Sequence, residues 1–184
     1  MKFGYYNQLK DIDNSRVYAD VLDEMRKEAI FCEQAGLDIV WPDEHHFHFG
    51  YHENTNAIVA GTMLAAHTSR IRIGLPLVAA NWHPLRLAED IALLDHLSRG
   101  RVEVDLGRGF QKHTIYNLNP RLRDIWPQRG ERSNQDAQAA SREYFAEVVE
   151  ILRKAWTEES FTHEGRYYKF PQEGLPWEFP DPPK

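Results

Sequence analysis

Short apolar runs alternate with amphipathic segments along most of the chain. Runs rich in β-branched residues are typical of buried parallel strands, whereas apolar positions spaced by three and four residues predict helices. The expected strands are Lys2–Tyr6, Leu37–Trp41, Ile71–Val78 and Val102–Leu106. The expected helices are Val17–Cys32, Ala57–His67, Pro84–Leu97 and Asp136–Trp156. The chain is therefore expected to consist of repeated strand–helix units.

Such alternation implies parallel strands joined by right-handed crossovers, either in an open doubly wound sheet or in a TIM (β/α)8 barrel. A dinucleotide-binding doubly wound sheet carries a glycine-rich turn after its first strand, and Asn7–Asn14 contains no glycine. This favours the barrel. A complete barrel needs about 250 residues, whereas the chain has 184. We therefore expect residues 1–184 to form a single incomplete α/β barrel domain, part of a longer chain, with the first four units present.

The rest of the chain is less regular. Gly107–Asn134 is a charged, proline-containing stretch too long for an ordinary connection, Phe161–Phe170 predicts a small hairpin around Gly165, and Gly174–Lys184 reads as proline-rich coil. In a half barrel, some apolar strand residues are expected to face the side that the missing half would cover. The residues expected there are Val40, Ile73, Leu75, Val102 and Val104.

Composition narrows the classes of partner. The chain has 22 Lys+Arg against 28 Asp+Glu, a net charge of −6, so we expect neither nucleic acid nor an anionic membrane as partner. The single cysteine, Cys32, cannot form an internal disulfide and lies in a helical stripe, where core packing is the expected role. We find no signal peptide and no apolar run of about 18 residues, and expect a cytoplasmic protein.

In a parallel barrel, the loops after the carboxyl ends of the strands carry the active site. The second such loop, Pro42–Asn54, is rich in histidines and carboxylates. They are His45, His46, His48 and His52, with Asp43, Glu44 and Glu53. An imidazole beside a carboxylate suits general acid–base catalysis near neutral pH. Zinc binding is the competing chemistry, but no cysteine pair or HExxH helix supports it, so we expect no metal; taken singly, most of these histidines fit solvated or core positions.

The fourth strand ends in GRGF. Gly107 and Gly109 permit close approach of the backbone to a ligand, and Arg108 between them can pair with a phosphate. The competing interpretation is a loop arginine paired with a local carboxylate. Trp41 and Trp82, near other strand ends, suit either stacking on a flat ring or packing in the core.

Several segments together carry a family resemblance. They are MKFGYY, GLDIVWPDEHHF, the HP-to-SRGR stretch that leads into VEVDLGRGF, REYFAEVVEILRKAW and FTHEGRYYKF. Over roughly residues 1–170, the chain resembles the bacterial luciferase-like flavin monooxygenases. The resemblance implies a TIM barrel that uses reduced FMN, supplied by a flavin reductase, and O2 to oxygenate a small organic substrate. It also implies that strands five to eight supply further flavin-phosphate contacts. The apolar surface that an incomplete barrel exposes leads us to expect a homo-oligomer.

The resemblance also assigns residues. His45 matches the family's active-site histidine, and Arg108 matches the arginine that reaches the flavin phosphate. Gly107 stands where luciferase has a reactive cysteine near the flavin. Gly74–Ala80 matches the segment under the flavin ring, which makes the cofactor contacts Leu77, Val78 and Ala79. Two alternatives stay open: an F420-dependent oxidoreductase of the sister branch, and a non-catalytic flavin-binding or half-barrel interaction protein.

Overall fold

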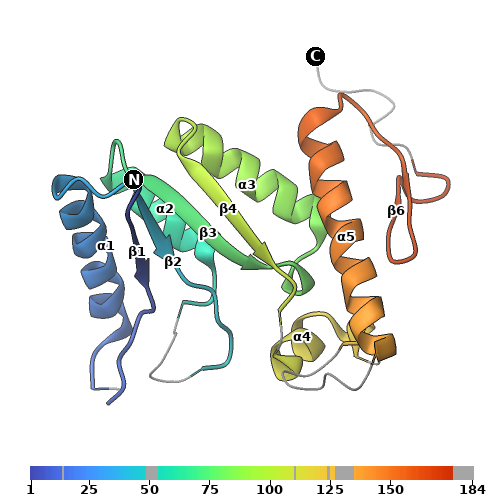
Figure 1. Cartoon of the computed structure of the whole chain (residues 1–184), viewed down its shortest axis with the longest axis horizontal. Coiled ribbons are helices and arrows are strands. Elements are labelled where there is room, and N and C mark those ends of the chain that lie inside the picture. The colour runs from blue at the N-terminus through green and yellow to red at the C-terminus, as the bar shows by residue number, and fades with distance from the viewer. Residues whose placement is uncertain (14, 49–53, 110, 124, 127–134, 176–184) are drawn as a thin grey trace.

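The computed structural model describes residues 1–13, 15–48, 54–109, 111–123, 125–126 and 135–175 (Figure 1). One parallel sheet forms its centre, in the order β1-β2-β3-β4. The strands are β1 (Gly4–Asn7), β2 (Ile39–Pro42), β3 (Arg72–Val78) and β4 (Val102–Gly107). The four predicted strands and their parallel order are confirmed, with their ends displaced by no more than about two residues.

A layer of helices covers one face of this sheet. Its members are α1 (Tyr18–Gln34), α2 (Ala57–His67), α3 (Pro84–Ser98) and α5 (Gln135–Thr157). Helix α2 packs against α1 and α3, and α3 packs against α5. Figure 1 shows α2 and α3 behind the sheet, with α1 and α5 at its two sides. Among the described residues, no helix is long and apolar enough to cross a membrane.

The segment after β4 contains structure that the sequence analysis did not predict. Helix α4 (Lys112–Leu118) and the 3-10 helix η2 (Pro120–Leu122) lie within the stretch expected to be irregular, and a further 3-10 helix, η1 (Ala79–Asn81), follows β3. The predicted hairpin is confirmed, since β5 (His163–Glu164) pairs antiparallel with β6 (Lys169–Phe170). The proline-rich coil expected at the end of the chain lies mostly outside the described residues.

The apolar residues of the strands pack on the helical side of the sheet, which differs from the expectation given above. Val40, Ile73 and Leu75 have no exposed surface, and the side chains of Ile73 and Leu75 approach Gly61 of α2. Val102 and Val104 pair in register with Ile73 and Leu75 and so point to the same side. The expectation that these five residues face the uncovered side was wrong, because they pack toward the helices.

The opposite face of the sheet carries charged and small residues and two large rings, those of Trp41 and Tyr6. Gly74 lies under Trp41, and a Cβ atom at position 74 would come within 2.1 Å of the indole ring. Arg72 and Glu103 form an ion pair on neighbouring strands, with 2.6 Å between Arg72 Nε and the carboxylate. Tyr6 on β1 also lies on this face and is half exposed.

Arg101, just before β4, joins three elements at the amino edge of the sheet. Its Nε donates to Ser98 O at the end of α3, at 2.7 Å. One terminal nitrogen donates to Thr68 Oγ1 and to Ile71 O, at 2.9 and 3.0 Å. The other donates to Ala65 O of α2 at 2.9 Å. The guanidinium of Arg101 therefore donates hydrogen bonds to carbonyl groups at the ends of α2 and α3 that have no partner within their helices.

The residues before Arg101 explain why the helix stops there. Arg99 and Gly100 both adopt the left-handed conformation, with φ of 61° and 78°. Gly100 N donates back to Asp95 O at 2.9 Å, which closes the end of α3 in the manner of a Schellman motif. The SRGR sequence thus ends one helix and presents Arg101 to the next strand.

Glu147 of α5 holds the β5–β6 hairpin. Its carboxylate accepts the backbone N–H groups of Arg166, Tyr167 and Tyr168, at 3.0, 3.1 and 2.7 Å. This approach requires glycine at position 165, because a Cβ atom there would come within 2.1 Å of Glu147 Oε1. The hairpin is therefore attached to α5 through one buried anion.

The sheet has two unpaired edges, and this generates a prediction for the chain of residues 1–184 expressed alone. In the described structure β1 pairs only with β2 and β4 only with β3, and Val104 on β4 is 38% exposed. Open edges beside exposed apolar surface favour edge-to-edge pairing. We expect dimers or larger species in sedimentation at micromolar concentration, and Val104→Lys should reduce them.

Leu93→Lys provides the control, because Leu93 is an exposed apolar residue of α3 on the helical layer. It should leave association unchanged. A monomeric parent chain, or association abolished by Leu93→Lys and kept in Val104→Lys, would contradict the prediction.

Candidate active site

The carboxyl ends of β2, β3 and β4 meet at one edge of the sheet, and a small cavity lies between the segments that follow them. Its volume is about 30 Å³, which suits water but not a flavin ring. The cavity is lined by Glu44, His45, His46, Val78, Asn81, Gly109, Gln111, Thr114 and Ile115. The structure therefore brings His45 together with Val78 and with the loop that carries Arg108.

Glu44 joins the loop after β2 to the loop after β3. Trp82 Nε1 donates to both of its carboxylate oxygens, at 3.2 and 3.1 Å, and Asn81 Nδ2 donates to one of them at 3.3 Å. His46 Nε2 lies 3.3 Å from the same oxygen. A buried carboxylate needs such partners to offset its loss of hydration. Glu44 thus fixes the two loops relative to one another, and Trp82 is held as its donor.

His45 lies among other aromatic rings beside the cavity. Its backbone N–H donates to Asn54 O at 2.8 Å, which fixes the backbone of the loop at residue 45. The rings of His45 and His48 meet edge to face, with 5.3 Å between centroids, and His113 lies 6.0 Å beyond His48. Gln111 Nε2 lies 3.0 Å from His48 Nε2. His45 is thus part of a row of imidazoles that runs toward α4.

Asp43 is the buried neighbour of these rings. It has no exposed surface, and its backbone N–H donates to Asn7 O at the end of β1, at 3.1 Å. Burial raises the pKa of its carboxyl from 3.8 to about 7, while the positive charges of His45, His48 and Lys10 act in the opposite direction. Asp43 therefore changes charge in the same pH range as histidine.

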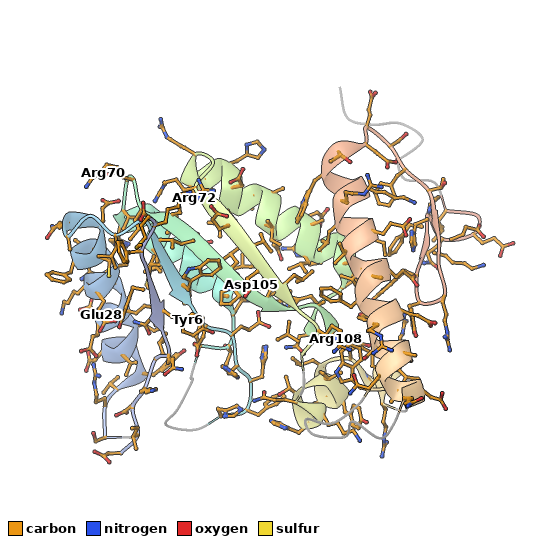
Figure 2. The ribbon with its side chains drawn as sticks, viewed as in Figure 1. Tyr6, Glu28, Arg70, Arg72, Asp105 and Arg108 are labelled. Atoms are coloured by element: carbon orange, nitrogen blue, oxygen red, sulfur yellow. The ribbon has the colours of Figure 1, made fainter. Side chains whose placement is uncertain are left out.

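Arg108 leaves the end of β4 toward α5 (Figure 2). Its Nη1 donates to Ser141 Oγ at 2.9 Å and to Gln138 Oε1 at 3.4 Å. Among the described residues no carboxylate pairs with it, so the competing interpretation of a loop arginine neutralised by a local carboxylate does not describe its contacts. Among the described residues, the guanidinium is therefore positioned by neutral oxygens.

The glycines and the end of β3 shape the same edge. Gly109 has φ of +85°, and a Cβ atom there would lie 2.5 Å from Val78 Cγ1, so this position requires glycine. The space beside Gly107 is open, since a Cβ atom added there would have Leu77 O as its nearest neighbour, at 3.8 Å. Of the three predicted cofactor contacts, Val78 presents its side chain to the cavity. Leu77 and Ala79 are 2% and 0% exposed, so both lie within the core at this edge.

Two members of the histidine-rich loop, His52 and Glu53, lie outside the described residues. In the part of the loop that the structure describes, the histidines and carboxylates form no group of three suited to a metal ion. Cys32 is a free thiol that is 6% exposed, which confirms its predicted place in the core. Trp41 lies against Gly74 on the open face of the sheet.

Comparison with known proteins now identifies the family. The sequence profile described as luciferase-like monooxygenase matches residues 1–183. The chain belongs to the luciferase-like monooxygenase family. This confirms the resemblance drawn from the EHHF, SRGR and GRGF segments. Since the match extends over nearly all of the chain, the stretch around α4 belongs to the same family domain.

Three known proteins are similar to this luciferase-like chain. The oxygenase component of a flavin-dependent trigonelline monooxygenase from Acinetobacter baylyi is 25% identical over 188 residues, 100% of this chain and 48% of the relative. The oxygenating constituent of 3,6-diketocamphane monooxygenase from Pseudomonas putida, solved with FMN, has a TM-score of 0.73 at 21% identity, covering 92% of this chain and 43% of that one. An F420-dependent secondary alcohol dehydrogenase has a TM-score of 0.69 at 21% identity, covering 91% and 46%.

Two conclusions follow from these relatives. The likeness to the two solved structures shows a shared fold, and their cofactors are FMN in one and F420 in the other. The chain spans about half the length of the relatives it matches. The four-stranded sheet of this luciferase-like chain therefore corresponds to part of a longer enzyme in each relative.

The sequence analysis missed the residues that hold its predicted site residues in place. Ser141, Gln138 and Gln111 contact Arg108 or His48 from elements far along the chain. One signal was available for Ser141, which is fully buried within the apolar stripe of α5. A hydroxyl at such a position needs hydrogen-bond partners. Ser141 Oγ donates to Gln138 O at 3.1 Å and accepts from Arg108 Nη1.

Asp43 generates a prediction about stability and pH. In the unfolded chain its carboxyl ionises near pH 3.8, whereas in the folded protein it stays protonated up to about pH 7. Between these values the folded state binds the extra proton, so the free energy of unfolding should fall as the pH rises, by about 1.4 kcal/mol for each unit of pKa difference. Asp43→Asn should remove this decline in urea denaturation measured at about pH 5 and about pH 8. Equal declines in both proteins would contradict the raised pKa.

Proposed function

We propose that this protein is a flavin-dependent monooxygenase that uses reduced FMN and O2 to oxygenate a small organic substrate. The observation that carries the proposal is the position of His45, which lines a cavity at the carboxyl edge of a parallel sheet in a luciferase-like chain. Arg108 lies at the end of β4 on the same edge, where its described partners are the neutral oxygens of Ser141 and Gln138. A flavin reductase would supply the reduced flavin in the cytoplasm, and the enzyme would be a homo-oligomer. The flavin-dependent trigonelline monooxygenase supports the reaction class.

The residues at the end of β4 have the charge and the space that binding of a flavin phosphate requires. The described partners of Arg108 are neutral oxygens, and the open Gly107 beside it leaves room for close approach. The cavity of about 30 Å³ is too small for the ring, so Val78 and His45 would contact the flavin only from the cavity wall. Bound reduced FMN would supply the electrons that activate O2.

The contacts on this chain are too few for tight binding. Micromolar affinity needs about −8 kcal/mol, whereas one exposed ion pair supplies roughly 0 to 1 kcal/mol. The remaining phosphate contacts would come from the half of the relatives that this chain does not match. We therefore propose that the activity belongs to the complete barrel, of which residues 1–184 are the incomplete domain predicted from the sequence.

The side chains at this edge of the sheet would transfer protons, position the loops and exclude water. His45 would hold or release a proton at a ring nitrogen near the reacting atoms. Glu44 fixes the loops on either side, through Trp82 and Asn81. Val78 and Ile115 present apolar surface to the cavity, and apolar surface next to a proton-transferring group limits access of water.

Two alternatives are separated by direct observation. An F420-dependent oxidoreductase would transfer hydride without consuming oxygen, and the likeness to the F420-dependent dehydrogenase concerns the fold. The absorbance of the copurified cofactor distinguishes FMN from F420. A non-catalytic flavin-binding or interaction protein would consume no oxygen when reduced flavin is supplied.

The role of His45 is tested in the complete enzyme. His45→Ala should lower the product formed per flavin oxidised by about 10²- to 10⁴-fold, the usual contribution of general acid–base assistance, with flavin binding changed only a few fold. His67→Ala is a suitable control, because His67 lies at the end of α2 and bonds only its own helix in the structure. An unchanged product yield in His45→Ala would rule out this role.

The role of Arg108 is tested by comparing two ligands. Arg108→Ala should weaken binding of FMN more than binding of riboflavin, because only FMN carries the phosphate that a guanidinium recognises. Arg153→Ala, an exposed arginine more than two helical turns from Ser141 on α5, serves as the control for net charge. Titration of each variant with both ligands provides the measurement. Equal losses for FMN and riboflavin would make Arg108 a structural residue.

A further inference from the structure

A second and larger cavity lies beside the β5–β6 hairpin. Its volume is about 690 Å³, within the range of cavities that hold small organic ligands. Most of its lining comes from residues 81–83 before α3, residues 118–121 at the end of α4 and in η2, and residues 165–170 of the hairpin. The described lining includes neither His45 nor Arg108, so the candidate flavin contacts lie outside this cavity.

Hydrogen bonds join the three walls of the cavity. Asn119 Nδ2 donates to Ala80 O at 3.2 Å and to the Tyr144 hydroxyl at 3.1 Å. The hydroxyl groups of Tyr144 and Tyr168 lie 2.7 Å apart, which connects this network to the hairpin. Glu147 attaches the same hairpin to α5 through backbone N–H groups. The walls are therefore fixed without a ligand, and a ligand does not have to order them on binding.

Aromatic side chains form one side of the cavity. Tyr168 and Phe170 of the hairpin stack, with 5.7 Å between their ring centroids. His83 meets both rings edge to face, at 5.5 and 5.7 Å. Burial and, after it, the charge of Arg121 lower the pKa of His83, so its ring is uncharged at neutral pH. A flat ring packs well against such a surface.

The charged residues of the lining are all basic. They are Arg121, Arg166 and Lys169, and the described lining contains no Asp or Glu. Two of the three have carboxylate neighbours outside the cavity: Arg166 is paired with Glu143 at 2.6 Å, and Lys169 lies 3.9 Å from Glu164. Arg121 is the third, and it differs from the other two.

Arg121 is exposed, and no carboxylate among the described residues forms an ion pair with it. Its charge acts on the aromatic wall, because it helps to lower the pKa of His83 and opposes the rise that burial causes in the pKa of Tyr168. Helix α3 begins directly after His83 and has no acidic residue in its first turn, so its N-terminus adds partial positive charge. An anion that enters this cavity therefore meets positive charge beside flat rings.

We propose that this cavity binds a small aromatic carboxylate. The ring of the ligand would lie against His83, Tyr168 and Phe170. Its carboxylate would lie beside Arg121. The inference goes beyond the proposed function, because it concerns a second ligand bound away from the flavin-phosphate contact at Arg108.

The test uses 2-naphthoate in the complete enzyme, without reduced flavin, and isothermal titration calorimetry. Arg121→Gln should weaken binding about three- to five-fold, the upper range for an exposed charge pair. It should leave binding of the neutral analogue 2-naphthamide unchanged. Arg123→Gln is the matched control, because Arg123 is also exposed, follows η2 and does not line the cavity. It should leave binding of both ligands unchanged.

A second measurement locates the ligand without a substitution at Arg121. In protein labelled at the histidine Cε1 carbon, with the His83 resonance assigned from His83→Asn, 2-naphthoate should shift that resonance. The midpoint should equal the one from calorimetry, because an aromatic ring beside the imidazole changes its magnetic surroundings. Saturation with oxidised FMN should leave the midpoint unchanged.

Several results would overturn the proposal. They are absence of binding, equal losses in Arg121→Gln and Arg123→Gln, an equal loss for 2-naphthamide in Arg121→Gln, or a His83 resonance that does not move. Competition by FMN would also overturn it, since the ligand would then occupy the flavin edge. None of these measurements involves oxygen or His45, so this inference and the proposed function stand or fail separately.

Discussion

The arrangement of strands and helices depends on the hydrogen bonds that the guanidinium of Arg101 donates. This guanidinium reaches the end of α2, the start of β3 and the end of α3 at once, at the edge where helices finish and strands begin. In this kind of fold each helix must return the chain to that edge before the next strand can pair. Because one charged group closes two such returns, from α2 to β3 and from α3 to β4, it stabilises the amino edge of the sheet. The carboxyl edge is left to the loops that carry chemistry.

The regular elements could be predicted because their periodicities are strong. The run of Ile71–Val78 and the apolar stripe of α3 admit few other interpretations, and both are present in the structure. Helix α4 was missed because it has only seven residues, within a stretch of charges and proline. Its Ile115, Leu118 and η2's Leu122 are nevertheless spaced by three and four, which was the available signal.

The orientation of the strands could not be read from alternation alone. In β2, Ile39 and Trp41 on one side are as apolar as Val40 on the other, so both sides resemble a core. Only tertiary neighbours decide between them: Gly61 of α2 admits Leu75 and Ile73 to the helical side, and Gly74 admits the Trp41 ring to the other. At the candidate site, the positions of His45 and Arg108 could be predicted because both residues follow the carboxyl ends of strands. The partners that hold them, such as Ser141, could not be predicted in this way.

The attachment of the hairpin has a consequence for how this sequence can vary. Glu147 receives three backbone N–H groups only because Gly165 leaves space for its carboxylate. A side chain at position 165 would displace that carboxylate, and a shorter acid at position 147 would fall a methylene short of the same N–H groups. The side chains allowed at positions 147 and 165 therefore depend on one another, and we expect a substitution at one to require a compensating change at the other.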